Sequence, residues 1–400
     1  MRRETQRVEQ LSTTVFKEGF VASKFAQIAN KNGEKDNHQP SSFITNHHHQ
    51  SSTLNTSFGS LYQIERTVLV HVIHSFIHSF IHTSFISMTP LVHCRSLACN
   101  VLKQVQTKRC YTSAAIRGVP NSLSKALAMS SPLEPISITK ATQQHEVYKE
   151  YLSCMVPRII NLKADESYPD CVFIEDTAIV IDDQAVITRI GADSRRGEVD
   201  AIKDSFIDIG LKVTDMRSDD GDNTNIATCD GGDVLYPVSY MRDAATGGSL
   251  QKRGGKHLFV GISSRTNHAG AKFLQKAFPQ VQVIPVELGE LSSDALHLKS
   301  IVTHLDENTL LMPIGNHWDQ LIDKMGLEEL GYEVIRLPDI KACNVISVNG
   351  KVIAQPHISQ ESIQILMEEV HAREMILVWV DASEFEKCDG ALTCKSILIP

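Results

Sequence analysis

Between residues 114 and 400 the chain alternates short apolar runs with stretches in which apolar residues recur every three or four positions. The second spacing predicts helices, because it gathers apolar side chains on one face of a 3.6-residue turn. Four helices are expected, the last of them capped by Ser359. Their apolar stripes are Val199, Ile202, Phe206 and Ile209; Ala271, Leu274 and Phe278; Trp318, Leu321, Ile322 and Met325; and Ile363, Leu366, Met367 and Val370.

The short apolar runs are rich in Val and Ile and predict strands. Their order is repeatedly strand, strand, helix, strand. One such unit cannot bury its own apolar face, so we expect a ring of ββαβ modules whose strand ends converge on a central site. The predicted fold class is therefore α/β. The expected strands are 171–174, 178–181, 185–188, 211–214, 257–260, 281–286, 309–312, 344–348, 351–354, 376–380 and 397–399.

Residues 1–113 differ in character, and we set them apart as a low-complexity extension that is disordered or serves in targeting. Residues 67–87 carry no formal charge and have the length of a membrane span, but four histidines interrupt them, so no anchor is expected. Residues 88–115 contain Arg and Lys without Asp or Glu, which is typical of a mitochondrial transit peptide. We expect a cytoplasmic protein, with mitochondrial import as the alternative if that segment acts as a transit peptide.

The composition limits the kinds of partner that the protein can bind. The formal net charge of -8 and the absence of a basic stripe argue against nucleic acid as a partner. Nine cysteines without a CxxC pair do not suggest a disulfide framework or a metal site, and they indicate a reducing compartment. We therefore expect a small-molecule substrate and a monomer or homodimer.

Two residues could carry acid–base or nucleophilic chemistry. Cys394 lies between the turn signal Asp389-Gly390 and the last apolar run, where a thiolate can be partly accessible. A small core hydrophobe is the commoner fate of a lone cysteine. His297, in the segment LHLKS, has the pKa range for proton transfer, and a hydrogen-bonded structural histidine is its alternative.

Acids and arginines form the other candidate groups. Asp170, Glu175 and Asp176 surround the strand-like CVFI, so the chain must bend if all three are to meet one ligand. Acids beside apolar residues favour a cationic ligand, whereas a solvated strand end is the alternative. The arginines of segment 189–196 and Arg265 suit a carboxylate, because the guanidinium fork binds it with two hydrogen bonds.

Six segments in register resemble the dimethylarginine dimethylaminohydrolase family of the pentein superfamily. The segments are PDCVFIED, ITRIGADSRRGE, CDGGDVLYP, SSRTNHAG, LHLKS and CDGALTC. The resemblance implies a five-bladed α/β propeller of ββαβ modules, with residues 114–400 as the pentein catalytic domain. The departures lie in loops: Ile190 replaces the usual proline, residues 242–256 form a Gly-rich insertion, and residues 287–295 are lengthened.

The resemblance also implies a role for each matching residue. Cys394 would be the nucleophile, His297 the proton donor and Asp230 the residue that orients the histidine. The acids would hold the guanidinium, the two arginines the substrate carboxylate, and residues 388 and 389 its amino end. The implied substrate-binding residues are Leu127 (on a mobile lid, aligned across a one-residue gap), Asp170, Glu175, Asp176, Arg195, Arg265, Cys388 and Asp389.

The reaction implied is hydrolysis of asymmetric dimethylarginine and monomethylarginine to citrulline and dimethylamine or methylamine, through a covalent thiouronium on Cys394. Such a family controls nitric oxide synthesis. No cofactor is required, and zinc at the Cys394 thiolate would inhibit. An arginine deiminase and a non-catalytic arginine-binding regulator on the same scaffold are the alternatives.

Overall fold

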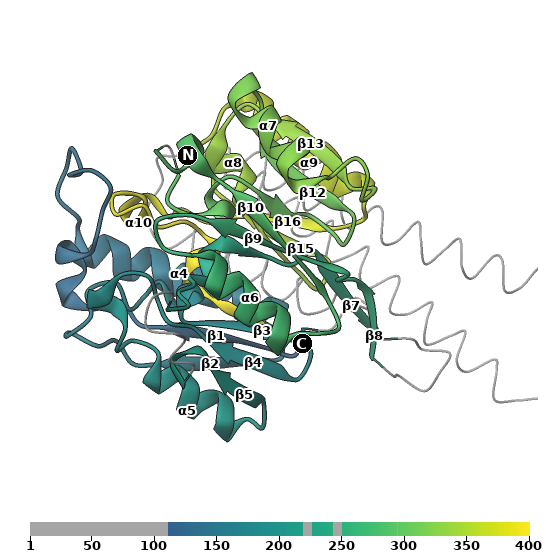
Figure 1. The fold of residues 1–400 in the computed structure, drawn as a ribbon. Helices are drawn as coiled ribbons and strands as arrows, with labels where there is room; N and C mark the ends of the chain where they lie inside the picture. The colour runs from purple at the N-terminus through teal and green to yellow at the C-terminus, as the bar shows by residue number, and fades with distance from the viewer. Residues whose placement is uncertain (1–110, 219–225, 243–249, 294) are drawn as a thin grey trace, which may run out of the picture. The chain divides into compact units, whose positions relative to one another are not determined.

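Five three-stranded sheets repeat one topology among the residues that the structure describes (Figure 1). In each sheet the second strand pairs antiparallel with the first and parallel with the third. The sheets are β17 (Ile397–Ile399), β1 (Ser113–Arg117) and β2 (Arg158–Leu162); β3 (Ala178–Ile181), β4 (Gln184–Ile187) and β5 (Lys212–Asp215); β6 (Val234–Leu235), β9 (His257–Ile262) and β10 (Gln282–Glu287); β11 (Thr303–His304), β12 (Thr309–Pro313) and β13 (Glu333–Leu337); and β14 (Ile346–Val348), β15 (Lys351–Ala354) and β16 (Ile376–Trp379).

A helix crosses from the second to the third strand in every module, because parallel neighbours need a crossover connection. These helices are α4 (Ile138–Met155), α5 (Asp200–Asp208), α6 (His268–Ala277), α7 (Asn316–Met325) and α9 (Gln360–Ala372). The predicted ββαβ repeat is thereby confirmed. The last strand of the chain completes the sheet of the first, since Ser113 of β1 pairs with Ile399 of β17.

The computed structural model describes residues 111–218, 226–242, 250–293 and 295–400, which belong to one unit of the chain. The extension predicted for residues 1–113 lies outside these residues except for its last three positions. Within the described ranges, no helix combines the length and the apolar character that a bilayer crossing requires.

The four predicted helices are present, and a serine or a glycine lies at one end of three of them. Ser359 caps α9, with its Oγ accepting from the Ser362 N–H (3.2 Å). Gly326 ends α7 in the left-handed conformation (φ 65°), where glycine has no steric cost. Gly210 follows α5 with φ 88°. Two further single-turn helices, α8 (Ile340–Cys343) and α10 (Ser383–Glu386), were not predicted.

Two expectations were wrong or incomplete. Residues 171–174 form no strand: they turn, and the chain continues as the 3₁₀ helix η2 (Ile174–Thr177), because this segment connects modules instead of pairing in a sheet. The 18-residue helix α4 was missed, since polar Gln144 and His145 occupy buried positions of its face. The Gly-rich insertion adds a separate hairpin, β7 (Val238–Arg242) with β8 (Leu250–Gly254).

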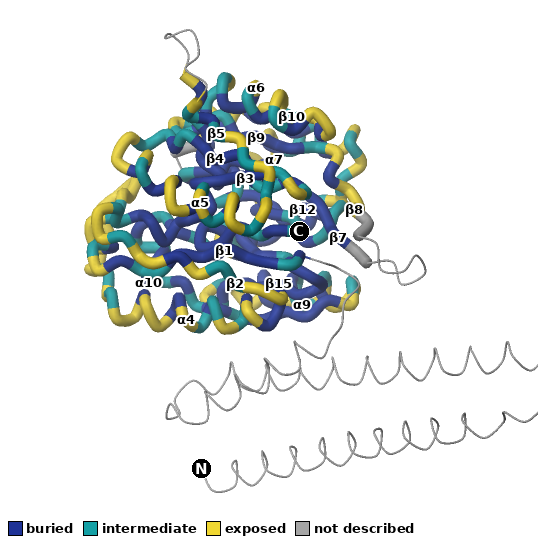
Figure 2. The backbone as a smooth tube through the Cα atoms, turned by 90° about the horizontal axis from the view of Figure 1, so that it is seen from below, coloured by how far each residue is buried: buried dark blue, intermediate teal, exposed yellow. Residues whose placement is uncertain are grey.

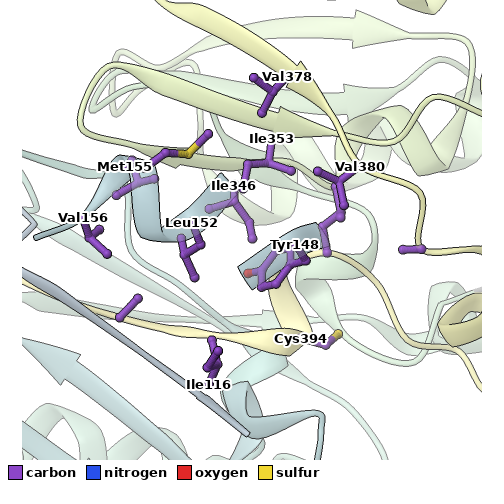
Figure 3. Packing of buried hydrophobic residues seen from close by; sticks show 14 of the residues in the cluster. Ile116, Tyr148, Leu152, Met155, Val156, Ile346, Ile353, Val378, Val380 and Cys394 are labelled. Atoms are coloured by element: carbon purple, nitrogen blue, oxygen red, sulfur yellow. The ribbon is translucent and has the colours of Figure 1, made fainter. Parts of the chain in front are cut away.

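The core lies between the strands and their covering helices. Figure 2 shows the strands largely buried and the outer faces of the helices exposed. Figure 3 shows one part of this core, where Tyr148 and Leu152 of α4 lie above Ile116 of β1, and Cys394 belongs to the same cluster.

The cysteines only partly follow expectation. Cys154 is disulfide-bonded, which the sequence did not predict. The five free cysteines of the described residues are all buried: Cys171, Cys229, Cys343, Cys388 and Cys394.

Candidate active site

First strands from all five modules line a central cavity of about 140 Å³. Glu175, Lys299 and Thr393 reach this cavity, but Cys394, His297 and Asp230 are not among the residues that line it. Four of these strands are entered through a short 3₁₀ turn, and the turns contact one another: η2 contacts η5 and η9, and η5 contacts η8. Every predicted catalytic residue lies on or beside these turns, as do two of the predicted acids. The turns are η2, η5 (Gly231–Asp233), η8 (Leu298–Ser300) and η9 (Thr393–Lys395).

His297 and Asp230 form a buried pair. His297 Nε2 lies 3.2 Å from Asp230 Oδ2, and each residue immediately precedes a 3₁₀ turn. The carboxylate is itself fixed, since the Gly191 N–H donates to Oδ1 (2.7 Å) and the Asp230 N–H donates to Thr266 Oγ1 (3.0 Å). The structure therefore brings these two residues together in the arrangement that an orienting carboxylate needs.

His297 lies in a strongly negative environment. Burial lowers the pKa of its imidazole, but the nearby Asp176, Asp233 and Asp230 outweigh burial and raise the pKa to about 9. The imidazole is consequently protonated at neutral pH. A protonated histidine can donate a proton to a leaving group, which is the role predicted from the sequence.

The two acids of η2, Glu175 and Asp176, form ion pairs with different partners. Lys299 Nζ donates to Glu175 Oε1 (2.6 Å), and Arg195 Nη1 donates to Asp176 Oδ2 (2.7 Å). A 3₁₀ turn supplies the bend that a strand would have lacked, and both carboxyl groups are buried. Burial raises the pKa of Glu175 despite Lys299. For Asp176, burial also favours the neutral form, but His297 and Arg195 prevail and lower the pKa.

Arg195 is engaged with protein acids along most of its guanidinium. Nε and Nη2 donate to the two oxygens of Glu198 (3.0 and 2.9 Å), while Nη2 also donates to the Phe173 carbonyl (2.9 Å). A contact with a substrate carboxylate would have to use the remaining Nη1 hydrogen, so the clamp stays a prediction. Arg265 is half-buried. Burial raises the pKa of Asp170, and the charges of Arg195 and Arg265 both oppose this rise, which indicates that Arg265 also lies near Asp170.

Cys394 lies at the centre of η9 and is 8% exposed. Its Sγ accepts from the Ala391 N–H (3.4 Å). Burial, Glu175 and Asp176 raise the pKa of the thiol to about 12, which places these acids close enough to act on the sulfur. The neighbouring Thr393 Oγ1 donates to Glu175 Oε2 (3.1 Å), joining the cysteine turn to the acid turn.

The remaining predicted residues lie together at a second edge of the site. The Leu127 N–H donates to Asp170 Oδ1 (3.0 Å), and the Met129 N–H donates to Asp389 Oδ2 (2.5 Å). Leu127 is 40% exposed. The loop that carries the predicted lid leucine is thus held by two of the acids expected to bind substrate. Cys388 is buried, with its Sγ donating to the Phe385 carbonyl (3.3 Å).

Sequence reasoning missed residues that support the turns. Asp233 Oδ1 accepts from the Leu298 N–H (3.0 Å), and burial raises the pKa of Asp233 to about 6. Asn344 Oδ1 accepts from the N–H groups of Leu392 and Thr393 (3.0 and 3.2 Å). Asp233 and Lys299 lie inside segments already singled out, CDGGD and LHLKS, but their partners are distant in sequence. Glu198 likewise ends the segment ITRIGADSRRGE, whereas Asn344 had been noted only as the start of an expected strand.

Three ligand-type atoms, from Asp176, Asp230 and His297, lie within 4.8 Å of one another, a spacing that a metal ion could use. The salt bridge from Arg195 to Asp176 and the His297–Asp230 contact account for this cluster without an ion. Cys394 is not part of it, so zinc at the thiolate stays a prediction.

Comparisons with known proteins agree with the fold. No family model matches the chain. A protein of uncharacterised function from Aeropyrum pernix is 30% identical over 73% of this chain and 96% of its own length. The N(G),N(G)-dimethylarginine dimethylaminohydrolase of Streptomyces coelicolor is 28% identical over 71% of this chain and 95% of its own length. The solved structure of the Pseudomonas aeruginosa dimethylarginine dimethylaminohydrolase, a cysteine-to-serine mutant with citrulline, has a TM-score of 0.58 at 27% identity and covers 72% of this chain and 99% of its own.

Five ββαβ modules around one cavity, together with these likenesses, define the pentein fold. The chain belongs to the dimethylarginine dimethylaminohydrolase family of the pentein superfamily. Its activity at the level of class is hydrolysis of a guanidino group in a small molecule.

Proposed function

We propose that the chain hydrolyses asymmetric dimethylarginine and monomethylarginine to citrulline and dimethylamine or methylamine, with Cys394 as the nucleophile. One observation carries the proposal: the acid turn η2 contacts both the cysteine turn η9 and the turn η5, which follows Asp230. Asp230 in turn contacts the protonated His297. A thiol, a cation-binding acid pair and a proton donor are the groups that this reaction needs.

Substrate binding would activate the thiol. Without bound substrate the thiol is neutral, since burial, Glu175 and Asp176 together outweigh the opposing effect of Lys299 on its pKa. A guanidinium bound beside these acids reverses the local charge and favours the thiolate. Binding also holds the guanidinium carbon in line for attack, and positioning of this kind can be worth several orders of magnitude in rate.

The covalent steps follow from this placement. The thiolate attacks the guanidinium carbon and forms a C–S bond, giving a tetrahedral adduct. The C–N bond to dimethylamine then breaks, with His297 donating its proton to the leaving nitrogen, and a thiouronium remains on Cys394. Water adds to the carbon as it gives a proton to His297. The C–S bond then breaks with its electron pair returning to the sulfur, the added hydroxyl passes its proton to that thiolate, and citrulline leaves.

The test is citrulline release by the full chain, measured separately with asymmetric dimethylarginine, monomethylarginine and arginine. We expect the methylated substrates to react faster and Cys394→Ser to abolish release. Cys343→Ser is the matched control, because Cys343 is another buried thiol, in α8, and its loss should leave turnover within about twofold. Faster release from arginine would indicate an arginine deiminase, and release that survives Cys394→Ser would contradict the proposed nucleophile.

We also propose residues 114–400 as the catalytic domain and a cytoplasmic location, with mitochondrial import as the alternative. Residues 88–115 fused to a fluorescent protein would decide between the two locations. Import into mitochondria would contradict the cytoplasmic assignment.

A further inference from the structure

Lys395, which follows the proposed nucleophile directly, lies in surroundings that the reaction above does not use. Its side chain has no exposed surface, and its Nζ has no hydrogen-bond partner within the described part of the chain. An ammonium in such a place loses its hydration without gaining a carboxylate partner, which is unfavourable for folding. A residue kept at that cost calls for a role beyond packing.

Two aromatic rings enclose the ammonium. Lys395 Nζ lies 4.3 Å from the centroid of the Tyr148 ring and 4.9 Å from that of Phe385. Both rings are held in place: the Tyr148 hydroxyl donates to Ser396 Oγ (2.7 Å), and Phe385 packs edge-on against Phe173 with centroids 6.2 Å apart. The negative faces of aromatic rings stabilise a cation, so this box can hold the ammonium in its charged form.

The charged groups around the aromatic box do not compete strongly with Cys394 for the ammonium. Burial outweighs the charges of Cys394, Asp381 and Glu386, which raise the pKa of Lys395 in that order of size, and the net pKa is lowered to about 7. His145, which stacks on Tyr148 at 6.2 Å, stays neutral, because burial and Lys395 lower its pKa to about 3. Once Cys394 ionises, its thiolate is the anion that acts most strongly on Lys395, while Lys299 is the cation that lowers the pKa of Cys394 from the side of the acids.

The aromatic box also lies close in the chain to the acids that surround the nucleophile. Cys394 belongs to the same core cluster as Tyr148 (Figure 3), and Phe173 lies two residues before Glu175. On that side, Glu175 and Asp176 oppose ionisation of the thiol. A cation one residue away on the same 3₁₀ turn has the opposite effect, and low-dielectric surroundings strengthen it.

We propose that Lys395 is a positioning residue for the Cys394 thiolate, and that its ammonium, caged by Tyr148 and Phe385, offsets the negative charge of the neighbouring acids. The inference rests on the proposed function only in taking Cys394 as the reactive thiol.

The test is the rate at which iodoacetamide alkylates Cys394 at pH 6.5, followed for the Cys394 peptide by mass spectrometry. Well below the pKa of a thiol this rate is proportional to the thiolate fraction, so no turnover is needed. Lys395→Met should lower the rate about tenfold, which corresponds to one unit of thiol pKa. Lys395→Arg, which keeps the charge and can stack in the same box, should restore the rate to within about threefold.

Controls separate charge from folding. Lys351→Met removes another buried lysine, on β15 of a different module, and should leave the alkylation rate unchanged. Lys395→Gln is measured alongside Lys395→Met with the same expectation, so a folding defect in one variant, seen by thermal unfolding, does not remove the test.

An unchanged rate in a folded Lys395→Met or Lys395→Gln chain would overturn this inference alone, as would a Lys395→Arg chain no faster than Lys395→Met. Alkylation whose rise with pH comes no earlier in the unaltered chain than in Lys395→Met would likewise overturn the inference alone, whereas citrulline release that survives Cys394→Ser would overturn the proposed function and the inference with it.

Discussion

Gly232→Ala would displace the proposed proton donor without removing any titratable group. A Cβ at this position would lie 2.5 Å from His297 Nδ1, 2.7 Å from its Cγ and 3.0 Å from Asp176 Oδ1. Ordinary contact begins at 3.4 Å, so the imidazole must move by about 0.9 Å. The backbone of Gly232 has no left-handed φ that would itself resist alanine. The added methyl therefore acts mainly on the ring.

Two consequences follow for Gly232→Ala. Extra volume in a packed core typically costs about 1–3 kcal/mol of unfolding free energy. A displacement of about 1 Å in a catalytic group can lower the rate on the order of a hundredfold. We therefore expect kcat for asymmetric dimethylarginine to fall roughly a hundredfold in a chain that still folds.

The assay is steady-state citrulline release, with urea unfolding of the same preparations. Gly118→Ala is the matched control: it follows β1, its Cβ would meet nothing closer than 3.2 Å, and it should leave kcat within about twofold. Wild-type kcat in a folded Gly232→Ala chain would refute the reasoning, because His297 could then not be the donor held in this geometry.

Three further predictions concern charge. Glu175→Gln removes one carboxylate proposed to hold the guanidinium and breaks its ion pair with Lys299. We therefore expect kcat/KM for methylated arginine to fall more than about tenfold in steady-state kinetics, and an unchanged value would contradict the assigned acid. The folded state raises the pKa of His297 from 6.5 to about 9, so its contribution is complete below pH 6.5 and is lost as the pH rises through about 9. His297→Asn should accordingly flatten the decline of urea stability across that window by roughly 3 kcal/mol, and an equal decline in both chains would argue against the raised pKa. Asp389→Ala frees the Met129 N–H and removes a predicted substrate contact, so KM should rise several-fold with little change in kcat; a lower KM would show that the loop contact mainly obstructs binding.

The sequence predicted the repeat because two modules, those of α5 and α9, carry a full set of signals; strands β1, β2, β6, β11 and β13 were not predicted. Ser359 caps α9, Gly210 follows α5, and the apolar runs other than 171–174 pair as strands in the expected order. It failed where polar side chains are buried. The face of α4 hides Gln144 and His145, so apolar spacing alone could not reveal the helix.

The site shows the same division. Residues within recognisable segments were found, and the structure places Asp230 against His297 as expected. What the sequence could not supply were pairings across the ring, such as Lys299 with Glu175, whose partners are distant along the chain. It also could not show that Glu198 accepts two of the Arg195 N–H groups.

The central claim is that Cys394 becomes covalently attached to the substrate carbon. Acid quenching of the full chain during turnover of asymmetric dimethylarginine, followed by peptide mass spectrometry, tests this directly. The Cys394 peptide should gain the mass of the substrate less dimethylamine, and the gain should vanish once substrate is exhausted. Citrulline formation without that adduct, or with an adduct on another cysteine, would contradict the account.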